Sequence, residues 1–475
     1  MAQKWNVLFY LLTDNNNMNT AEKFLEESET KTFDLKHRKT IANNMGKYKA
    51  SVDQGLTQYA DHELARDRAE YTKSQTILQL DKYLTEFETR FTKKGGKVIW
   101  ATDAKEALLE IVQIFTKNHA KLVVKSKSMV TEEIHLNDYL EEHGIEAFET
   151  DLGEYIVQLA GQRPYHIVTP AMHMSKEDVS NLFHEKLNTP KTDDAQQLTM
   201  IARRLMRSKY TDADIGITGG NFLIADIGGV AVTENEGNAR LTTTFPKIHI
   251  AVVGIEKMLP SMADLNLFWP LLATSGTGQQ VTVYNTIFTG PRQPGETDGP
   301  EEMYVVLLDN GRSKLIADEV KRQALNCIRC GACLNACPVY KNVGGHTYES
   351  VYSGPIGSII SPQYFGLKEF KHLSYASSLC GGCTAVCPVK IDIHNILLQN
   401  RKQSIDENLG NPYEKLGFKI WTIAMKNRSL MNIGGSNIKN WALSVLFKNT
   451  WGKRRSDIKL APKSFNQLWK DRRGK

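Results

Sequence analysis

From Glu22 to about Phe91 the chain is polar, lacks proline and carries apolar residues at helical spacing. Apolar positions that recur every three or four residues form one face of an α-helix. The pattern predicts a helical region, and we take residues 1–94 as one unit in which residues 1–17 are an extension.

Short apolar runs then recur at intervals of about 20–25 residues, with helical patterns between the first three. They lie at Val98–Trp100, Leu122–Val124, Ile145–Phe148 and His166–Thr169. Strands that alternate with helices are typical of βαβ units and a mainly parallel sheet. We therefore predict an α/β domain over residues 95–310.

The second half of this domain has a different pattern. Three short apolar runs are separated by glycines, at Ile215–Asn221, Ile224–Gly229 and Val230–Thr233. Glycines between such runs indicate short strands joined by tight turns. The Gly/Pro-rich stretch Gly290–Pro300 predicts a surface loop near the end of the domain.

The composition is that of a globular protein, with 41% hydrophobic and 24% charged residues. No apolar run approaches the ~18 residues that a membrane-spanning helix needs. The run Trp5–Leu12 is short and is not followed by a small-residue cleavage pattern. We expect a cytoplasmic protein without membrane-spanning helices.

All seven cysteines fall between Cys327 and Cys387, which indicates one shared chemical role. The first four follow the pattern Cys-x2-Cys-x2-Cys-x3-Cys-Pro of bacterial ferredoxins, in which three thiolates hold one [4Fe–4S] cluster and the fourth reaches a second. A zinc site would leave three cysteines unused, and an odd count in a cytoplasmic protein disfavours disulfides. We predict two [4Fe–4S] clusters in a module at residues 311–400.

The second run, from Ser377 to Pro388, keeps this register but has serine in place of the first cysteine. The crossed arrangement of two-cluster ferredoxins assigns Cys327, Cys330, Cys333 and Cys387 to cluster 1 and Cys337, Cys380 and Cys383 to cluster 2. The fourth position of cluster 2 stays open. The ligand at this position is the oxygen of Ser377, a solvent or substrate molecule, or a cysteine from a partner. Alternatively, the cluster loses this iron atom and becomes [3Fe–4S].

Residues 401–475 form a basic C-terminal region, with 17 Lys or Arg against 5 Asp or Glu. Such a region suits an acidic partner, an anionic membrane surface or nucleic acid, and it is also common as a solvated tail. We expect no nucleic-acid binding, and we leave a peripheral membrane contact open.

Two polar groups in the α/β domain are candidate binding sites. Lys125-Ser126-Lys127-Ser128 lies where a strand ends and a helix begins, which suits a carboxylate or phosphate. A serine N-cap between two surface lysines explains the same residues. The second group is Asn221, Asp226, Glu234, Glu236 and Asn238. These side chains form either a polar pocket with an acid–base carboxylate or ordinary turns and caps.

The lone histidines His249 and His346 are expected to be packed or exposed, and the catalytic residues are left unknown. Together with both cysteine runs, the block Gly216–Arg240 (GITGGNFLIADIGGVAVTENEGNAR) resembles the lactate utilization protein B family, and the resemblance extends from Ala21 onward.

That resemblance implies a CoA-transferase/ribose-5-phosphate-isomerase-like α/β lactate-utilization (LUD) domain, a helical two-cluster ferredoxin-like module and a family-specific C-terminal region. It also implies that serine at Ser377 is typical of the family, with cluster ligands at the seven cysteines. Two sister subunits are implied, one rich in cysteine and one with only a LUD domain.

The leading hypothesis is an iron–sulfur electron-transfer subunit that takes part in oxidising L-lactate to pyruvate. The sequence does not indicate the electron acceptor, nor whether this subunit itself carries out the chemistry. One alternative is a self-sufficient iron–sulfur hydroxy-acid oxidoreductase. A less favoured alternative is a regulatory sensor based on a labile cluster.

Overall fold

The computed structural model describes residues 19–427, 429–430, 433–447, 456 and 458–473. The chain divides into two compact units, Met1–Ser404 and Ile405–Lys475. The predicted extension at residues 1–17 lies outside the described residues.

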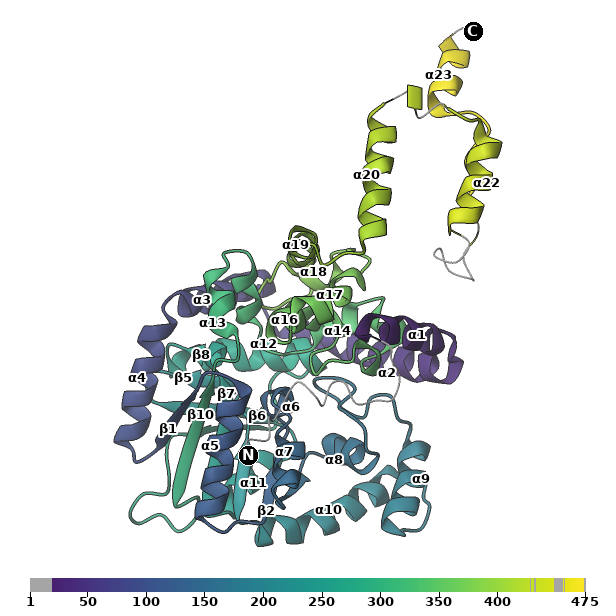
Figure 1. Ribbon diagram of the computed structural model, residues 1–475. Coiled ribbons are helices and arrows are strands. Elements are labelled where there is room, and N and C mark those ends of the chain that lie inside the picture. The colour runs from purple at the N-terminus through teal and green to yellow at the C-terminus, as the bar shows by residue number, and fades with distance from the viewer. Residues whose placement is uncertain (1–18, 428, 431–432, 448–455, 457, 474–475) are drawn as a thin grey trace, which may run out of the picture. The chain divides into compact units, whose positions relative to one another are not determined.

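The first unit is built on a six-stranded parallel sheet with the strand order β1-β10-β7-β4-β2-β3 (Figure 1). Its strands are β1 Lys97–Ala101, β2 Leu122–Lys125, β3 Glu146–Glu149, β4 Ile215–Thr218, β7 Ile248–Gly254 and β10 Glu302–Leu308. Parallel neighbours need crossover connections, which are usually helical. The predicted α/β class with a mainly parallel sheet is therefore confirmed.

Both faces of this sheet are covered. Successive residues of a strand point to opposite faces, so Ile250 and Val252 of β7 enter one hydrophobic core while Ala251 and Val253 enter another. The first core includes α5 (Ala104–Lys117), α6 (Met129–Glu133) and α7 (Leu136–Glu142). The second includes α4 (Leu80–Lys93) and a smaller sheet.

The smaller sheet has the strand order β8-β5-β6-β9. Its strands are β5 Phe222–Ile224, β6 Gly229–Glu234, β8 Met258–Leu259 and β9 Tyr284–Phe288. The predicted glycine turn lies between β5 and β6, where Gly228 has φ +56° and a Cβ would lie 2.4 Å from the backbone N of Phe91. The predicted loop at residues 290–300 joins β9 to β10.

Three helices pack outside β2 and share a core with Val124. They are α8 Leu152–Leu159, α9 Lys176–Leu187 and α10 Ala195–Asp212. The short elements α11 Asn238–Thr244, η3 Ile255–Lys257 and η4 Met262–Asp264 and the helix α12 Leu265–Thr277 complete the domain.

The strand predicted at His166–Thr169 is wrong, because this segment is an irregular loop. The Nδ1 atom of His166 accepts the backbone N–H groups of Val168 and Thr169 at 3.1 and 3.3 Å. These donors are satisfied locally and do not enter a sheet ladder.

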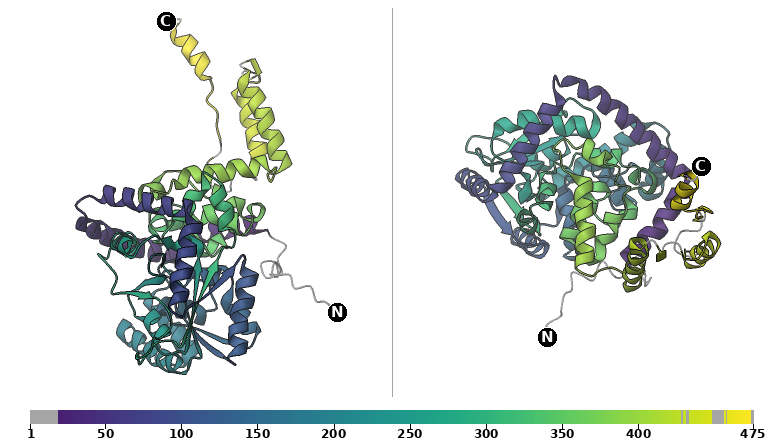
Figure 2. Two further views of the ribbon diagram at one scale, coloured as in Figure 1. Left: turned by 90° about the vertical axis from the view of Figure 1, so that its left-hand side faces the viewer. Right: turned by 90° about the horizontal axis from the view of Figure 1, so that it is seen from above.

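The predicted N-terminal helical region is confirmed. It contains α1 Thr20–Phe33, α2 Leu35–Gly55, η2 Leu56–Gln58, α3 His62–Leu78 and α4, drawn in purple to blue in Figure 2. Phe24 of α1 meets Tyr348 edge-on, with ring centroids 5.7 Å apart. The N-terminal helices therefore pack on the cysteine-rich segment far along the chain.

The cysteine-rich segment is helical, and no strand occurs in it among the described residues 311–400. Its elements are α13 Arg312–Ala317, η5 Lys321–Asn326, α14 Ala332–Ala336, α15 Tyr340–Val343, η6 His346–Tyr348, α16 Gly354–Tyr364, α17 Leu367–Tyr375, α18 Gly382–Ala385 and α19 Ile393–Asp406.

This segment lies at the carboxyl edge of the parallel sheet, shown in green in Figures 1 and 2. Arg329 contacts Glu256, which follows β7, and Tyr352 donates to Glu133, which lies beyond the end of β2. Ligands of parallel α/β sheets bind outside the carboxyl ends of the strands.

The second unit contains α20 Pro412–Lys426, α22 Ser436–Phe447 and α23 Phe465–Arg473. Aromatic side chains on these helices are exposed, including Phe418, Trp421 and Trp469. Within the described part of the chain, no helix combines the length and the apolar character needed to cross a membrane.

Candidate metal centre

The seven cysteines are free of disulfide bonds. Five are buried, whereas Cys327 is half-buried and Cys380 is exposed. They lie on loops and short helices around α14 and α18, which contact each other.

Four of the thiols interact with one another. Burial raises the pKa of Cys333 well above its usual range, and the thiolates of Cys327, Cys330 and Cys387 raise it further. Burial also raises the pKa of Cys387 to about 12, with a contribution from Cys327. The structure therefore brings together Cys327, Cys330, Cys333 and Cys387, which we call the first group.

The other three thiols form a second group, Cys337, Cys380 and Cys383. Burial raises the pKa of Cys383 to about 11, and the thiolates of Cys337 and Cys380 add to this shift. The exposed Cys380 differs, because the backbone N–H of Gly382 and the hydroxyl of Ser378 lower its pKa.

The two cysteine runs have the same local backbone. Arg329 and Leu379 occupy equivalent places with φ +61° and +53°, and the glycines two residues later are also left-handed. The N–H of Arg329 donates to Cys327 Sγ at 3.4 Å, and the N–H of Leu379 donates to Ser377 Oγ at 3.1 Å. Ser377 therefore stands in the second turn where Cys327 stands in the first.

The donor set fits iron–sulfur clusters. Backbone N–H groups of Arg329, Tyr340 and Ile391 donate to cysteine sulfurs at 3.4–3.5 Å, and such hydrogen bonds are a means of tuning cluster potentials. Among the described residues no three His, Cys, Asp or Glu side chains are arranged to hold a single ion. Seven thiols in two groups are more than the four ligands that one zinc ion takes, and cysteine thiolates are the ligands of iron–sulfur clusters.

Three basic side chains lie near Cys327 of the first group. Burial lowers the pKa of Lys73 to about 7 and that of Lys257 to about 8, while the thiolate of Cys327 acts in the opposite direction on both. The side chain of Arg329 is 10% exposed, and Cys327 helps to raise its pKa well above the usual range. Its guanidinium lies 4.7 Å from the ring centroid of Tyr352.

A buried ion-pair network joins these cations to the sheet. Arg312 is fully buried and donates to Glu256 at 2.6 Å and to Glu133 at 2.8 and 2.9 Å. Lys73 Nζ donates to the carbonyl oxygens of Glu256 and Met258 at 2.5 and 3.2 Å. The charges compensate one another, as burial of ions requires.

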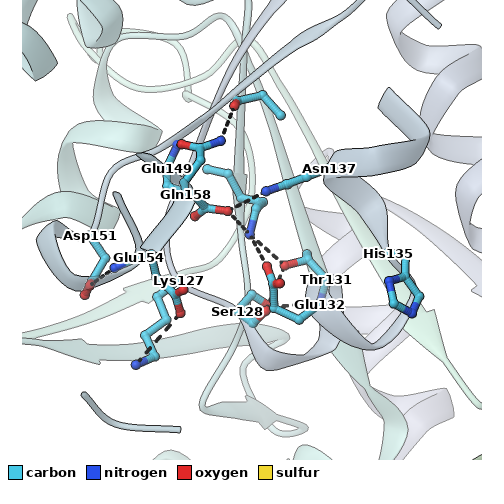
Figure 3. Close-up of polar contacts among 12 residues, drawn as sticks. Lys127, Ser128, Thr131, Glu132, His135, Asn137, Glu149, Asp151, Glu154 and Gln158 are labelled. Carbon is cyan, nitrogen blue, oxygen red and sulfur yellow. Dashed lines mark hydrogen bonds and ion pairs between the residues drawn. The ribbon is translucent and has the colours of Figure 1, made fainter. Parts of the chain in front are cut away.

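The structure separates the four residues of the predicted anion site. Ser128 caps α6, because its Oγ accepts the N–H of Thr131 at 3.3 Å. Lys125 is buried and paired with Glu149 at 2.7 Å and Glu132 at 3.1 Å (Figure 3). The N-cap interpretation is therefore correct for Ser128, but the interpretation of Lys125 as a surface lysine is wrong.

The five acidic and amide residues do not form one pocket. Asn221 accepts the N–H of Thr233, and Asp226 accepts that of Met262. Glu234 accepts the N–H groups of Ala239 and Arg240, and Asn238 accepts that of Ala239. Turn and cap roles account for these four residues.

Glu236 differs from the other four. Burial and the neighbouring Asp151 raise its pKa to about 7, whereas the N–H of Leu152 and the ammonium group of Lys127 lower it. It accepts the N–H of Leu152 at 3.3 Å.

The two lone histidines have structural partners, as expected. Burial lowers the pKa of His249 to about 3, and its Nε2 lies 2.8 Å from Thr218 Oγ1. His346 Nε2 lies 2.7 Å from the carbonyl oxygen of Arg163.

Sequence reasoning missed several polar residues around the cysteines, namely Lys73, Glu133, His166, Glu256, Lys257, Arg312 and Asn335. They come from six separate parts of the chain and carry no spacing signal. Arg329 and Asn335 lie between cysteines of the first run, and this position in the sequence was the one available sign of a role at the metal centre.

Comparison with known proteins gives two family matches, the LUD domain over residues 84–308 and the 4Fe-4S dicluster domain over residues 323–391. A solved structure of a duf162 family protein from Deinococcus radiodurans covers 48% of this chain and 98% of its own. Its 13% identity and TM-score of 0.28 are too low to support an argument.

Similar full-length proteins are more informative. Lactate utilization protein B of Bacillus velezensis is 45% identical over 383 residues, 80% of this chain and 79% of that protein. The Bacillus subtilis protein of the same name matches equally well. The Escherichia coli "Uncharacterized electron transport protein YkgF" is 41% identical over 410 residues, 86% of each chain. With a LUD domain followed by a 4Fe-4S dicluster domain, this chain belongs to the lactate utilization protein B family.

Proposed function

We propose that this protein is the iron–sulfur electron-transfer subunit of a lactate-oxidising system and that it works with two sister subunits, one cysteine-rich and one with only a LUD domain. The first group of thiols holds one [4Fe–4S] cluster and the second group holds another. The observation that carries the proposal is the division of seven thiols into groups of four and three, in the crossed pattern of two-cluster ferredoxins.

Bound clusters would carry electrons one at a time. The residues packed around each group of thiols determine how exposed its cluster would be. The first group is enclosed by α3 and α12, since Arg66 Nε donates to the carbonyl oxygen of Cys387 at 3.0 Å and Gly276 lies against Cys330. The second group has the exposed Cys380. We assign this exposed side to electron exchange with a sister subunit.

Ser377 is the residue that would complete the second cluster, because its oxygen accepts the N–H of Leu379 just as Cys327 Sγ accepts that of the equivalent Arg329. Free thiols favour a reducing compartment such as the cytoplasm. We further propose that the parallel α/β domain has the CoA-transferase/ribose-5-phosphate-isomerase-like fold.

Anaerobic reconstitution with iron and sulfide tests the proposal. We expect about eight iron atoms per chain, four for each cube, and EPR signals from two interacting clusters after reduction. Four or fewer iron atoms in repeated preparations would remove the two-cluster assignment. Reduction by lactate only in the presence of the sister subunits would distinguish an electron carrier from a self-sufficient oxidoreductase.

A further inference from the structure

Helix α20 of the second unit carries many apolar side chains that are exposed to solvent. Its large apolar residues are between 46% and 84% exposed. They are Tyr413, Leu416, Phe418, Ile420, Trp421, Ile423 and Met425. Soluble proteins rarely leave a continuous apolar patch of this kind in water. This helix therefore has the character of a binding surface.

The lysines of α20 lie together on the remaining side of the helix. At about 100° per residue, Lys415, Lys419 and Lys426 fall in one stripe about 40° wide, which we call the lysine stripe. Thr422 borders this stripe, and all three lysines are exposed. The one acidic residue of the helix, Glu414, lies in its first turn. Helix α20 is therefore amphipathic, and its polar face is basic.

The other two helices of the second unit also expose aromatic rings. Trp441 of α22 is 68% exposed, and Trp469 of α23 is 45% exposed. The guanidinium of Arg473 lies 5.3 Å from the ring centroid of Trp469, so basic and aromatic groups adjoin here too. Residues 405–475 contain four of the seven tryptophans of the chain. Tryptophan is enriched where a membrane meets water, because its ring is apolar and its N–H is polar.

Charge indicates which surface these helices fit. Residues 401–475 have 17 Lys or Arg against 5 Asp or Glu, which favours a negatively charged partner. Protein–protein interfaces are depleted in lysine. By contrast, helices with lysines on one face and Trp, Phe and Leu on the other lie in the surface of anionic membranes. The composition of α20 therefore favours lipid over a protein partner.

We infer that α20, together with the exposed aromatic side chains of α22 and α23, binds the surface of an anionic phospholipid bilayer. The helix lies in the plane of the interface, with its apolar side chains among the acyl chains. The lysine stripe reaches the phosphate groups, because the long apolar stem of lysine lets its charged end remain in water. The inference is independent of the proposed function, since it rests on residues of the second unit alone.

Co-sedimentation of the full-length, cluster-loaded protein with lipid vesicles tests the inference. Vesicles of phosphatidylcholine and phosphatidylglycerol in equal parts are compared with vesicles of phosphatidylcholine alone. We expect the anionic vesicles to bind the protein at least about 100-fold more tightly, because each Lys or Arg near an anionic surface strengthens binding about fivefold. Added salt should weaken this binding, since ions screen the attraction.

One triple variant tests the lysine stripe. Lys415→Gln, Lys419→Gln and Lys426→Gln together should weaken binding to anionic vesicles about 100-fold. A control variant removes the same charge from exposed lysines of α2 and should change the affinity less than about twofold, because salt screens charges away from the contact. Its substitutions are Lys39→Gln, Lys47→Gln and Lys49→Gln.

A second variant tests the apolar face without a change in charge. Leu416→Gln with Ile420→Gln should weaken binding on the order of 100-fold, about 10-fold for each side chain that no longer gains from leaving water. The matched control is Leu25→Gln with Leu35→Gln, at positions that are 67% and 76% exposed in α1 and α2. This control should bind vesicles as the wild type does. Circular dichroism and iron content check that every variant is folded.

Three outcomes would overturn the inference. Equal binding to both kinds of vesicle would show that lipid charge plays no part. If no vesicle binds and the apolar variant loses a sister subunit, the face is a protein interface. If no vesicle binds and the lysine variant loses affinity for duplex DNA, the region binds nucleic acid. None of these results changes the iron content, so the proposed function is judged separately.

Discussion

The two groups of cysteines have the same backbone turns in different surroundings. A Cβ at Gly331, in the first turn, would meet Val168 at 3.0 Å and His166 at 3.2 Å, whereas a Cβ at Gly381, in the second, has no atom within 4 Å among the described residues. Buried cations face the first group. One repeated motif thus forms an enclosed, positively surrounded site and an open one.

This difference has a physical consequence for electron flow. Burial and nearby charge are two of the means by which a protein sets cluster potentials. Buried cations favour the more negative, reduced form of a cluster, so we expect the first cluster to have the higher potential. The second cluster, with an exposed cysteine and a serine, should be the more labile one and the one that partners reach.

Removing a cysteine from each group should separate the two sites most clearly. Cys330→Ala should eliminate the first cluster and, because metal binding is coupled to folding, also loosen the module. Cys380→Ala, at an exposed position, should affect only the second cluster. Iron analysis and EPR of both variants provide the measurement. Equal loss of both clusters in each variant would contradict two separate sites.

Breaking the ion-pair network behind the first group should have the next largest effect, a loss of stability. Arg312→Met leaves Glu133 and Glu256 buried without their cation, so the free energy of unfolding should fall by about 3–5 kcal/mol. Denaturant unfolding followed by circular dichroism measures this change. The control is Lys97→Met at the exposed pair with Glu302, which should cost less than about 1 kcal/mol. Similar losses in the two variants would show that the network is not a structural support.

Making the two runs identical should reduce the difference in lability. Ser377→Cys provides a fourth thiolate to the second cluster, and we expect iron loss in air to slow about 10-fold, a typical effect of a changed metal ligand shell. The [3Fe–4S] EPR signal reports that loss. Ser378→Cys is the matched control on the neighbouring residue, and protection by this variant as well would argue against Ser377 as the fourth position.

The smallest expected effect is a shift in midpoint potential when one of the basic side chains near the first group is removed. Lys257→Gln removes a positive charge near Cys327, so the midpoint potential of the first cluster should fall on the order of 50 mV, close to the 59 mV of a tenfold change for one electron. Lys341→Gln, a half-buried lysine beside Cys337, should shift only the second cluster, and by less. Redox titration followed by EPR distinguishes the two. An unchanged first potential would mean that the cations are compensated by Glu256.

Local patterns predicted most of the fold. Apolar runs such as Val98–Trp100 and Leu122–Val124 became strands of the parallel sheet because their alternation with amphipathic helices leaves few other ways to bury them. The failure at His166–Thr169 has a local cause. A side-chain nitrogen replaced the sheet as the acceptor of two backbone N–H groups, and hydropathy does not register that competition.

The sequence by itself determined the α/β class, the helical N-terminal region and the two cysteine runs, because each depends on spacing between residues close in the chain. Only the tertiary structure decided that Lys125 is buried in a close ion pair with Glu149 at 2.7 Å, while Lys127 lies 4.0 Å from Glu154. It also decided that Lys73, Lys257 and Arg329 meet near one thiol. Electrostatic interactions act through space, so residues from distant segments combine in ways that no short sequence pattern records.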